Sequence, residues 1–292
     1  MTSPTVSPVD PPSYRHVLVP LDGSDLAEAA LPVAEALADR FGAELVAVSV
    51  AAPTYAEQTR EFVADRLDDA WGARLRVVES NDIVAAITGV ADELGDTLVC
   101  MSSHGRGRVG GAVIGSVAKE VLEATGAPVV MVGHGVLERH GADGYAPLGS
   151  GRLVACVDGG EESEQVLPPA AGFATALGLR LSVVTVAEPS PPPVRDDVPW
   201  HRHHGPDRDA DQYIEELAQR WRSVVPDLSA QVVYDPIGPG RGIEAHLRGE
   251  PADLVAVTTH ARTGLERVLL GSGAANVIQH STAPVLVVPL EG

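Results

Sequence analysis

Short hydrophobic runs alternate with longer amphipathic segments along the first half of the chain. The runs are rich in Val and Leu and predict buried strands at 17–21, 45–50, 75–78, 98–101 and 129–132. The segments between them predict helices at 25–41, 56–71, 83–94 and about 115–125. Strands that alternate with helices in this order are typical of a parallel sheet with right-handed crossovers.

The same order of elements starts again after residue 150. Predicted strands recur at 153–157, 181–186, 232–234, 254–257 and 285–288. An internal repeat of this size indicates two tandem units of one fold. The predicted boundaries are a disordered tail at 1–13, a first unit at 14–134, a linker at 135–150 and a second unit at 151–292. The second unit contains an inserted surface loop at about 188–211, which is rich in Pro, Asp and His.

Composition excludes several classes of function. The net charge of −19 argues against binding to nucleic acid or to an anionic membrane, because phosphate neutralisation needs clustered Lys and Arg. No apolar run reaches the roughly 18 residues of a membrane span. Cys100 and Cys156 lie in strand-like runs and form no spaced framework, which predicts buried reduced thiols. Because no signal-peptide pattern is present either, we expect a cytoplasmic protein.

An aspartate follows the first predicted strand of each unit, Asp22 in the first and Asp158 in the second. Ligands of open parallel sheets bind at the carboxyl ends of the strands, where a carboxylate accepts hydrogen bonds from ribose hydroxyls or a base amine. The alternative is a solvated turn aspartate before a helix. Recurrence in both units favours ligand binding.

A Gly-Ser pair begins a predicted helix after the fourth strand of each unit, at Gly115-Ser116 and at Gly271-Ser272. Glycine allows close approach of a phosphate to the backbone, and the amides at the helix start donate to it. An ordinary helix cap is the alternative for either pair taken alone. The loop that precedes each pair follows an apolar run, so we expect it to cradle an anion.

Three other patterns are weaker. Glycines at 105, 107 and 110 spell G-x-G-x-x-G, but they follow the fourth strand, whereas a dinucleotide fingerprint follows the first. No lysine follows Gly115, so the segment is not a P-loop. Histidines at 201, 203 and 204 with aspartates at 207, 209 and 211 suit either a metal site or, more simply, a solvated loop. His104 and His260 recur at matched positions, where either a phosphate contact or a structural hydrogen bond explains them.

With these residues the chain resembles a tandem universal stress protein. The resemblance rests on Val-Pro-Leu-Asp-Gly-Ser at 19–24, on Ser-His-Gly-Arg at 103–106 with its downstream Gly-Ser, and on the final Ala-Pro-Val-Val pattern. It implies two Rossmann-like α/β/α units, each with a five-stranded, mostly parallel sheet. It also implies that the last strand of one unit pairs with that of the other, here within one chain as a pseudo-dimer. Further association into a homodimer stays open.

The resemblance also implies the positions of the nucleotide contacts. ATP-binding members of the family carry Gly, two residues, Gly, nine residues, then Gly-Ser or Gly-Thr. The matching positions are Ser102, Gly105, Gly115 and Ser116 in the first unit, and Thr258, Ala261, Gly271 and Ser272 in the second. Contacts to adenine and ribose are implied for Asp22 and Val50, and for Asp158 and Val186. The first unit therefore departs from the signature at one glycine and the second unit at two.

The resemblance predicts an ATP-binding regulatory protein of the stress response that holds ATP, with or without Mg²⁺, in one or both units and acts on a regulatory protein partner. No Ser-His-Asp, HExxH or paired-carboxylate arrangement points to a dedicated enzyme, although positioning alone can support slow ATP hydrolysis. The alternative is a protein of the same family that binds no nucleotide and works through protein contacts. An adenylyl-transferring enzyme is a more distant alternative, since its His-rich or Lys-Ser loops are not found in the sequence.

Overall fold

The computed structural model describes residues 6–67, 73–104, 114–136, 151–187, 210–261, 268–269 and 271–290. Its strands are β1 (His16–Pro20), β2 (Glu44–Ala51), β3 (Arg74–Glu79), β4 (Thr97–Ser102), β5 (Val129–Val132), β6 (Arg152–Val157), β7 (Arg180–Ala187), β8 (Ser229–Tyr234), β9 (Leu254–Thr258), β10 (His260–Ala261), β11 (Val268–Leu269) and β12 (Val285–Val288). Its helices are α1 (Asp25–Glu28), α2 (Leu31–Phe41), the 3-10 helix η1 (Pro53–Tyr55), α3 (Ala56–Arg66), α4 (Ile83–Leu94), α5 (Ser116–Thr125), α7 (Glu161–Glu164), α8 (Leu167–Leu177), α9 (Ala210–Trp221), α10 (Pro239–Gly249) and α11 (Ser272–His280).

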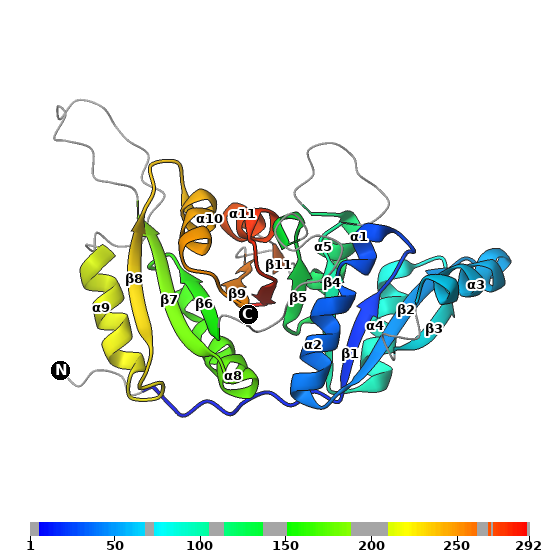
Figure 1. Ribbon diagram of the computed structural model, residues 1–292, viewed down its shortest axis with the longest axis horizontal. Coiled ribbons are helices and arrows are strands. Elements are labelled where there is room, and N and C mark those ends of the chain that lie inside the picture. Colours follow the sequence, from blue (N-terminus) through cyan, green and yellow to red (C-terminus); the bar gives the residue numbers. More distant parts are fainter. Residues whose placement is uncertain are drawn as a thin grey trace.

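The strands form one twisted ten-stranded sheet in the order β3-β2-β1-β4-β5-β12-β9-β6-β7-β8 (Figure 1). Within each unit every neighbouring pair is parallel, so each unit contributes the predicted five parallel strands. The predicted fold class, two tandem α/β units, is confirmed. The two sheets are not separate, however, because β5 and β12 join them edge to edge.

Helices cover both faces of this sheet and bury two hydrophobic layers. One layer packs α2, α3, α8 and α9 against alternate residues of the strands, including Val17 and Val19 of β1. The other packs α4, α5, α10 and α11 against the opposite face, to which Leu18 points. The alternation along β1 follows from the two-residue period of a strand. In the described part of the chain, no helix is long and apolar enough to cross a membrane.

The two units meet at the antiparallel pair of β5 and β12, as the resemblance implied. Val130 lies opposite Leu286 in the register of this pair. Beyond β5 the backbone passes directly against the carboxyl end of α11: a Cβ added to Gly133 would lie 1.9 Å from the carbonyl oxygen of Ile278. Gly135 makes a similar approach, 2.5 Å from the carbonyl oxygen of Ser281, and Val136 is buried. The start of the predicted 135–150 linker is therefore packed, and residues 137–150 lie outside the described residues.

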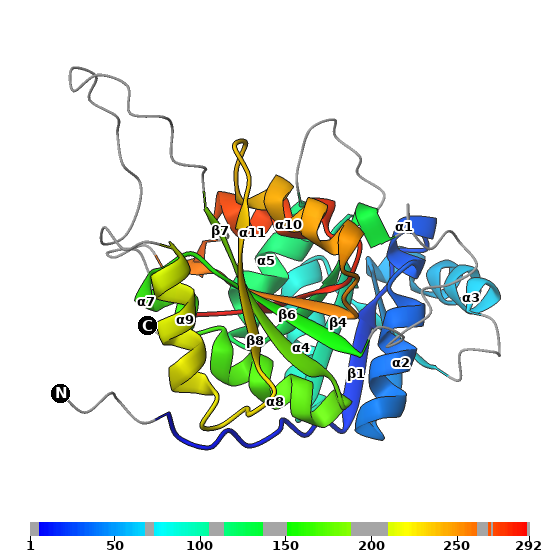
Figure 2. The same cartoon turned by 60° about the vertical axis from the view of Figure 1, so that its left-hand side comes forward.

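The segment before β1 packs across both units, which corrects the predicted disordered tail for residues 6–13. Val9 packs against the hydrophobic layer, and the carbonyl oxygen of Asp10 lies 3.1 Å from a Cβ built on Gly172 of α8. The segment runs from the second unit to the first along one side of the molecule (Figures 1 and 2). At its end the Tyr14 ring contacts Phe41 of α2 and Phe173 of α8, with centroids 5.1 and 5.8 Å away. Residues 1–5 lie outside the described part.

The helix predicted at 25–41 is two helices. Pro32 is the cause, because proline lacks a backbone N–H and its ring clashes with the carbonyl four residues earlier, here that of Glu28. Glu28 is the last residue of α1, and α2 begins at Leu31. The second unit repeats the break between α7 and α8, where Pro168 takes the same position.

Replacing Gly133 by alanine is expected to destabilise the junction between the units. The added methyl group would meet backbone rather than a movable side chain, so the cost should reach about 3 kcal/mol or more. The matched control is Gly89→Ala in α4, where a Cβ meets no atom within 4 Å. That change should be neutral or stabilise by about 0.5–1 kcal/mol. Urea unfolding of the three proteins measures both effects, and equal midpoints for Gly133→Ala and the wild type would contradict the expectation.

Candidate functional site

A cavity of about 240 Å³ lies at the carboxyl ends of β1 and β4 in the first unit, and we call it the first cavity. It brings together five of the predicted site residues: Asp22, Val50, Ser102, Gly115 and Ser116. Residues from four elements converge here because the carboxyl ends of parallel strands share one edge of the sheet. Gly105, the remaining predicted residue of this unit, lies outside the described residues.

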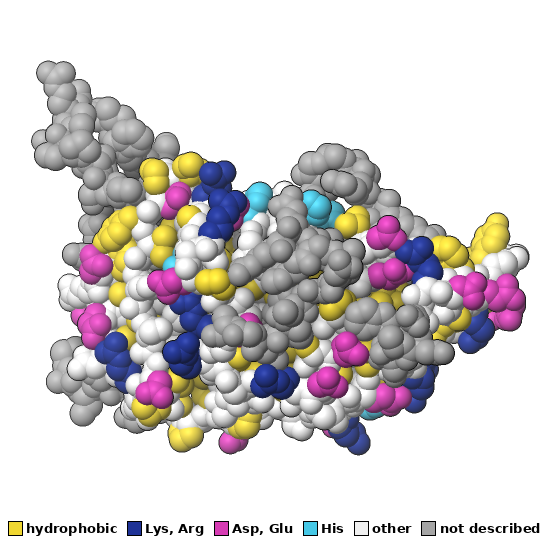
Figure 3. All heavy atoms as spheres, viewed as in Figure 1, with side chains coloured by type: hydrophobic (Ala, Val, Ile, Leu, Met, Phe, Trp, Pro, Cys, Tyr) yellow, Lys and Arg dark blue, Asp and Glu magenta, His cyan; other side chains and the backbone are white. Residues whose placement is uncertain are grey.

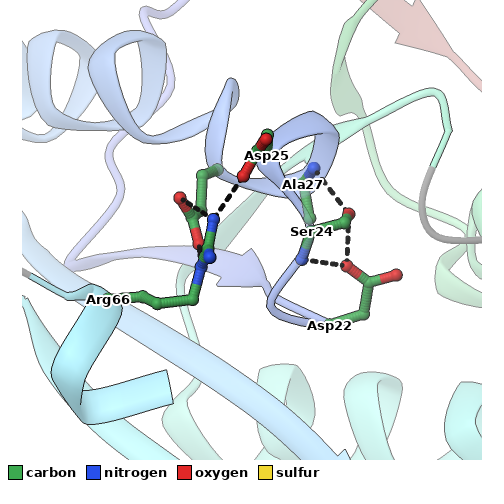
Figure 4. A network of polar contacts seen from close by, with 6 residues as sticks. Asp22, Ser24, Asp25, Ala27 and Arg66 are labelled. Atoms are coloured by element: carbon green, nitrogen blue, oxygen red, sulfur yellow. Dashed lines mark hydrogen bonds and ion pairs between the residues drawn. The ribbon is translucent and has the colours of Figure 1, made fainter. Parts of the chain in front are cut away.

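Local hydrogen bonds orient the Asp22 carboxylate at the edge of this cavity. Its Oδ1 accepts from the backbone N–H of Ser24 at 3.0 Å and from the Ser24 hydroxyl at 2.6 Å. Ser24 caps α1, because its Oγ accepts from the N–H of Ala27. Gly23 has a φ of +74°, a conformation that favours glycine, and so turns the chain sharply between Asp22 and the helix. Figure 4 shows this linked arrangement.

Arg66 at the end of α3 ties down the same short helix. Its guanidinium donates to the carboxylates of Asp25 and Glu28, which bracket α1 (Figure 4). The hydrogen bonds that Arg66 donates to Glu28, and then those to Asp25, raise the pKa of Arg66. The second unit repeats the pair, with Arg220 of α9 lying 2.9 Å from Glu164 of α7. A four-residue helix has little stability of its own, so this contact holds the turn that carries the aspartate.

The amino end of α5 forms the opposite wall of the first cavity. Ser102, at the end of β4, is buried, and Gly115 donates its N–H to the carbonyl of Ser103 at 2.8 Å. Gly115 caps α5 without a side-chain hydrogen bond. The first amides of a helix have no intrahelical acceptor, so this end suits an anion. His104 also lines the cavity, and its Nδ1 lies 3.0 Å from the Ser103 hydroxyl.

Apolar side chains that the sequence reasoning did not select complete the first cavity. Ile83 and Ile87 of α4 lie along one side, and Met101 of β4 forms the floor with Val48. Ile83 is 45 % exposed although it is the first residue of α4, directly after the helix cap Asp82. An apolar residue directly after a helix cap was the signal in the sequence that could have identified Ile83 as a lining residue. An apolar wall beside a carboxylate and a helix start suits a ligand with a flat apolar part and an anionic part.

The equivalent cavity of the second unit, the second cavity, is about 110 Å³. It is lined by Asp158, Val186 and Thr258 of the predicted set. Gly271 caps α11 and Ser272 begins it, and Gly271 is not among the described residues that line this cavity. Asp158 is exposed, and its Oδ1 accepts from the N–H of Gly160, which stands where the first unit has Ser24.

The loop of the second unit differs from the predicted open cradle. His260–Ala261 forms β10, which pairs with Val268–Leu269 as β11 in a small antiparallel hairpin. The backbones of β10 and β11 thus pair with each other, and residues 262–267 lie outside the described residues. Ala261, at the position of a family glycine, lies within β10.

Both cysteines are free, as predicted, and they differ in access. Cys100 is fully buried, and burial raises its pKa. Cys156 is partly exposed and lines the second cavity where the first unit has Pro20. Burial raises the pKa of the Cys156 thiol to about 12, so it stays protonated at neutral pH and is a poor nucleophile.

Among the described residues, no cluster of three or more His, Cys, Asp or Glu side chains has the arrangement of a metal site. The histidines at 201, 203 and 204 lie outside the described residues.

Acidic and basic side chains are interspersed on the face shown in Figure 3.

The structure describes a protein with two tandem α/β units, each with a cavity at the carboxyl ends of its strands. The universal stress protein family model matches this chain twice, at residues 13–133 and 150–289. The chain belongs to the universal stress protein family.

Individual relatives share the sequence at moderate levels. A universal stress protein of Mycolicibacterium smegmatis is 26 % identical over 234 residues, which cover 80 % of this chain and 74 % of that protein. The crystal structure of a universal stress protein from Archaeoglobus fulgidus has a TM-score of 0.62 at 20 % identity, covering 94 % of this chain and 97 % of that chain. A universal stress protein solved in complex with cAMP is 27 % identical, with a TM-score of 0.31, and covers 37 % of this chain and 88 % of that chain.

Loss of the Arg66 guanidinium is expected to loosen α1 and the turn that carries Asp22. In Arg66→Gln, amide hydrogen exchange at Ser24 to Ala29 should accelerate about two- to fivefold, since exchange reports local opening of the weakest elements. Arg60→Gln is the matched control, because Arg60 lies on the same helix and contacts only Glu57, at 3.9 Å, among the ion pairs of the described residues. Equal exchange at α1 in the two variants would show that Arg66 does not hold the turn.

Proposed function

We propose that this chain binds an adenine nucleotide, with ATP as the principal ligand, in the first cavity and serves as a regulatory protein of the stress response. The observation that carries the proposal is the convergence of Asp22, Ser102 and the amino end of α5 on one cavity of about 240 Å³. Small-molecule sites begin at roughly 300 Å³, so an open cavity of this size suits a nucleoside whose phosphates extend outward. Family membership supports the same ligand through the signature positions.

Each wall of the first cavity suits one part of a nucleotide. The Asp22 carboxylate, held by Ser24, is positioned to accept hydrogen bonds from ribose hydroxyls. Val50 and Ile83 offer apolar surface to the base. The amides at the start of α5 and the Ser116 hydroxyl suit the phosphates, because a helix start carries partial positive charge.

The proposal includes no dedicated catalytic reaction. The described side chains that line the first cavity include neither a lysine nor an arginine to stabilise a transferring phosphoryl group. Slow hydrolysis of ATP by positioning alone is compatible with the site, and Mg²⁺ would then be carried by the phosphates. The regulatory output would pass to a protein partner that senses the bound and free forms.

The alternative function is a protein that binds no nucleotide and acts through protein contacts. The second unit favours it, because its cavity is smaller and its loop forms the β10–β11 hairpin. The first unit opposes it, since the features that suit a nucleotide are together there. Analysis of bound nucleotide separates these functions.

Replacing Asp22 by asparagine is expected to weaken ATP binding about 10- to 100-fold, the range expected when a charge-assisted hydrogen bond worth roughly 1.5–3 kcal/mol is lost. Isothermal titration with ATP, ADP, GTP and cAMP measures affinity and selectivity. Asp65→Asn, an exposed position on α3 away from the cavity, is the charge-matched control and should bind as the wild type does.

In a second measurement, the purified wild type and both variants are denatured, and any released nucleotide is identified by chromatography. Nucleotide found there, or bound in the titration, supports the proposal if Asp22→Asn reduces it and Asp65→Asn does not. An absence of any nucleotide together with no heat on adding ATP would exclude nucleotide binding and leave the protein-contact function.

A further inference from the structure

The two cavities occupy the same place in the two units but differ in size by more than a factor of two, about 240 against 110 Å³. The equivalent walls are β2 with α4 in the first unit and β7 with α10 in the second. Ile87 and Ile243 line the two cavities at matched positions and align the two helices. The difference therefore lies in how each helix packs.

Two glycines bring α10 close to its neighbours. A Cβ added to Gly242 would lie 2.6 Å from Cγ1 of Val186 and 3.1 Å from its Cγ2. A Cβ added to Gly240 would lie 2.5 Å from the Cβ of Asn276 in α11. No real Cβ atom is accommodated at such distances, so α10 occupies its position only because both residues are glycine.

The first unit has side chains at both positions. Counting from the aligned isoleucines, Val84 corresponds to Gly240 and Ala86 to Gly242. Side chains at these places would not fit the close approach that α10 makes to Val186 and Asn276. Val186 is the residue that the family resemblance assigns to the base and ribose, and in the second unit α10 packs directly against it.

Two independent features of the second unit point the same way. The β10–β11 hairpin engages its own backbone groups where a phosphate cradle was expected. Asp158 lacks a serine hydroxyl on its carboxylate, because Gly160 replaces the serine, and the side chain is exposed rather than half-buried as Asp22 is.

We propose that the chain binds one nucleotide, in the first unit, and that Gly240 and Gly242 of α10 are the residues that close the second unit to nucleotides. This inference rests on the proposed function and specifies it. A cavity of about 110 Å³ is well below the roughly 300 Å³ at which small-molecule sites begin. The second unit keeps the family fold and has lost the space for the ligand.

The first experiment uses the unmodified chain. Photolabelling with 8-azido-ATP, followed by proteolysis and mass spectrometry, locates the bound base, and titration with ATP gives the number of sites. We expect one equivalent of ATP and labelled peptides from the first unit only. Two equivalents, or labelled peptides from both units at similar yield, would overturn the inference while leaving nucleotide binding intact. The absence of both labelling and binding would instead reject the proposed function.

The second experiment tests the role of the glycines through Cys156, which lines the second cavity. In Gly242→Ala the new methyl group must displace α10, because the β-branched Val186 has little rotamer freedom. Alkylation of Cys156 by iodoacetamide should then accelerate about tenfold or more, as access to the thiol increases. Gly249→Ala is the matched control on the same helix, where a Cβ meets no atom within 4 Å.

Cys100 is fully buried, so its alkylation serves as the internal control for unfolding. Acceleration at Cys156 with Cys100 unlabelled supports the role of Gly242, and equal rates in the two alanine variants would overturn it. If Gly242→Ala unfolds, so that Cys100 reacts as well, the double variant Gly242→Ala with Val186→Ala removes the clash and is tested in its place. There, Cys100 should again be protected, which would show that contact of the new methyl group with Val186 displaced the helix, and continued labelling of Cys100 would overturn the role of the glycine.

Discussion

The antiparallel contact between β5 and β12 is the interaction on which the arrangement of the whole molecule depends. It joins two five-stranded parallel sheets into one and covers the edge that each would otherwise expose. Because the pair is antiparallel, the end of β5 lies beside the start of β12, and the chain leaving β5 must pass the carboxyl end of α11. The close approach at Gly133 is the consequence, and it explains why a residue without a side chain stands there.

This junction leaves each cavity inside its own unit, because the described residues that line each of them come from one unit alone. Asp22 and Asp158 keep the same place after the first strand, and both units keep an ion pair between the first short helix and the third, through Arg66 and Arg220. The two units differ instead in the residues that line the cavities. Gly242 of α10 stands where α4 has alanine, and a methyl group there would lie 2.6 Å from Cγ1 of Val186, which is too close for a well-packed interior.

The strands were predictable from the sequence, and the packing of the segments between them was not. The Val- and Leu-rich runs and the internal repeat are signals that can be read from the sequence, and the structure confirms the strands and the repeated order that they predicted. Pro32 was also a readable signal, and the single helix predicted across it was wrong. Residues 6–13 have the composition of a disordered tail, but their order comes from packing on α8 at Gly172, a contact that a local pattern does not encode. Five of the residues selected from the sequence line the first cavity, as expected. The sizes of the cavities were not predictable in this way, because they depend on how the helices pack against the sheet.

Family membership and fold apply equally to both units, so neither distinguishes a unit that binds a ligand from one that does not. The two units differ in a few contacts: the amide and hydroxyl of Ser24 donate to Asp22 where the amide of Gly160 donates to Asp158, and α4 has alanine where α10 has glycine. A fold of this kind tolerates the loss of a ligand, since the sheet and the junction are stabilised by hydrophobic burial and backbone pairing that do not involve the cavity. The second unit contributes the β12 edge that pairs with β5 and the α8 surface that packs against Tyr14 and Phe41 of the first.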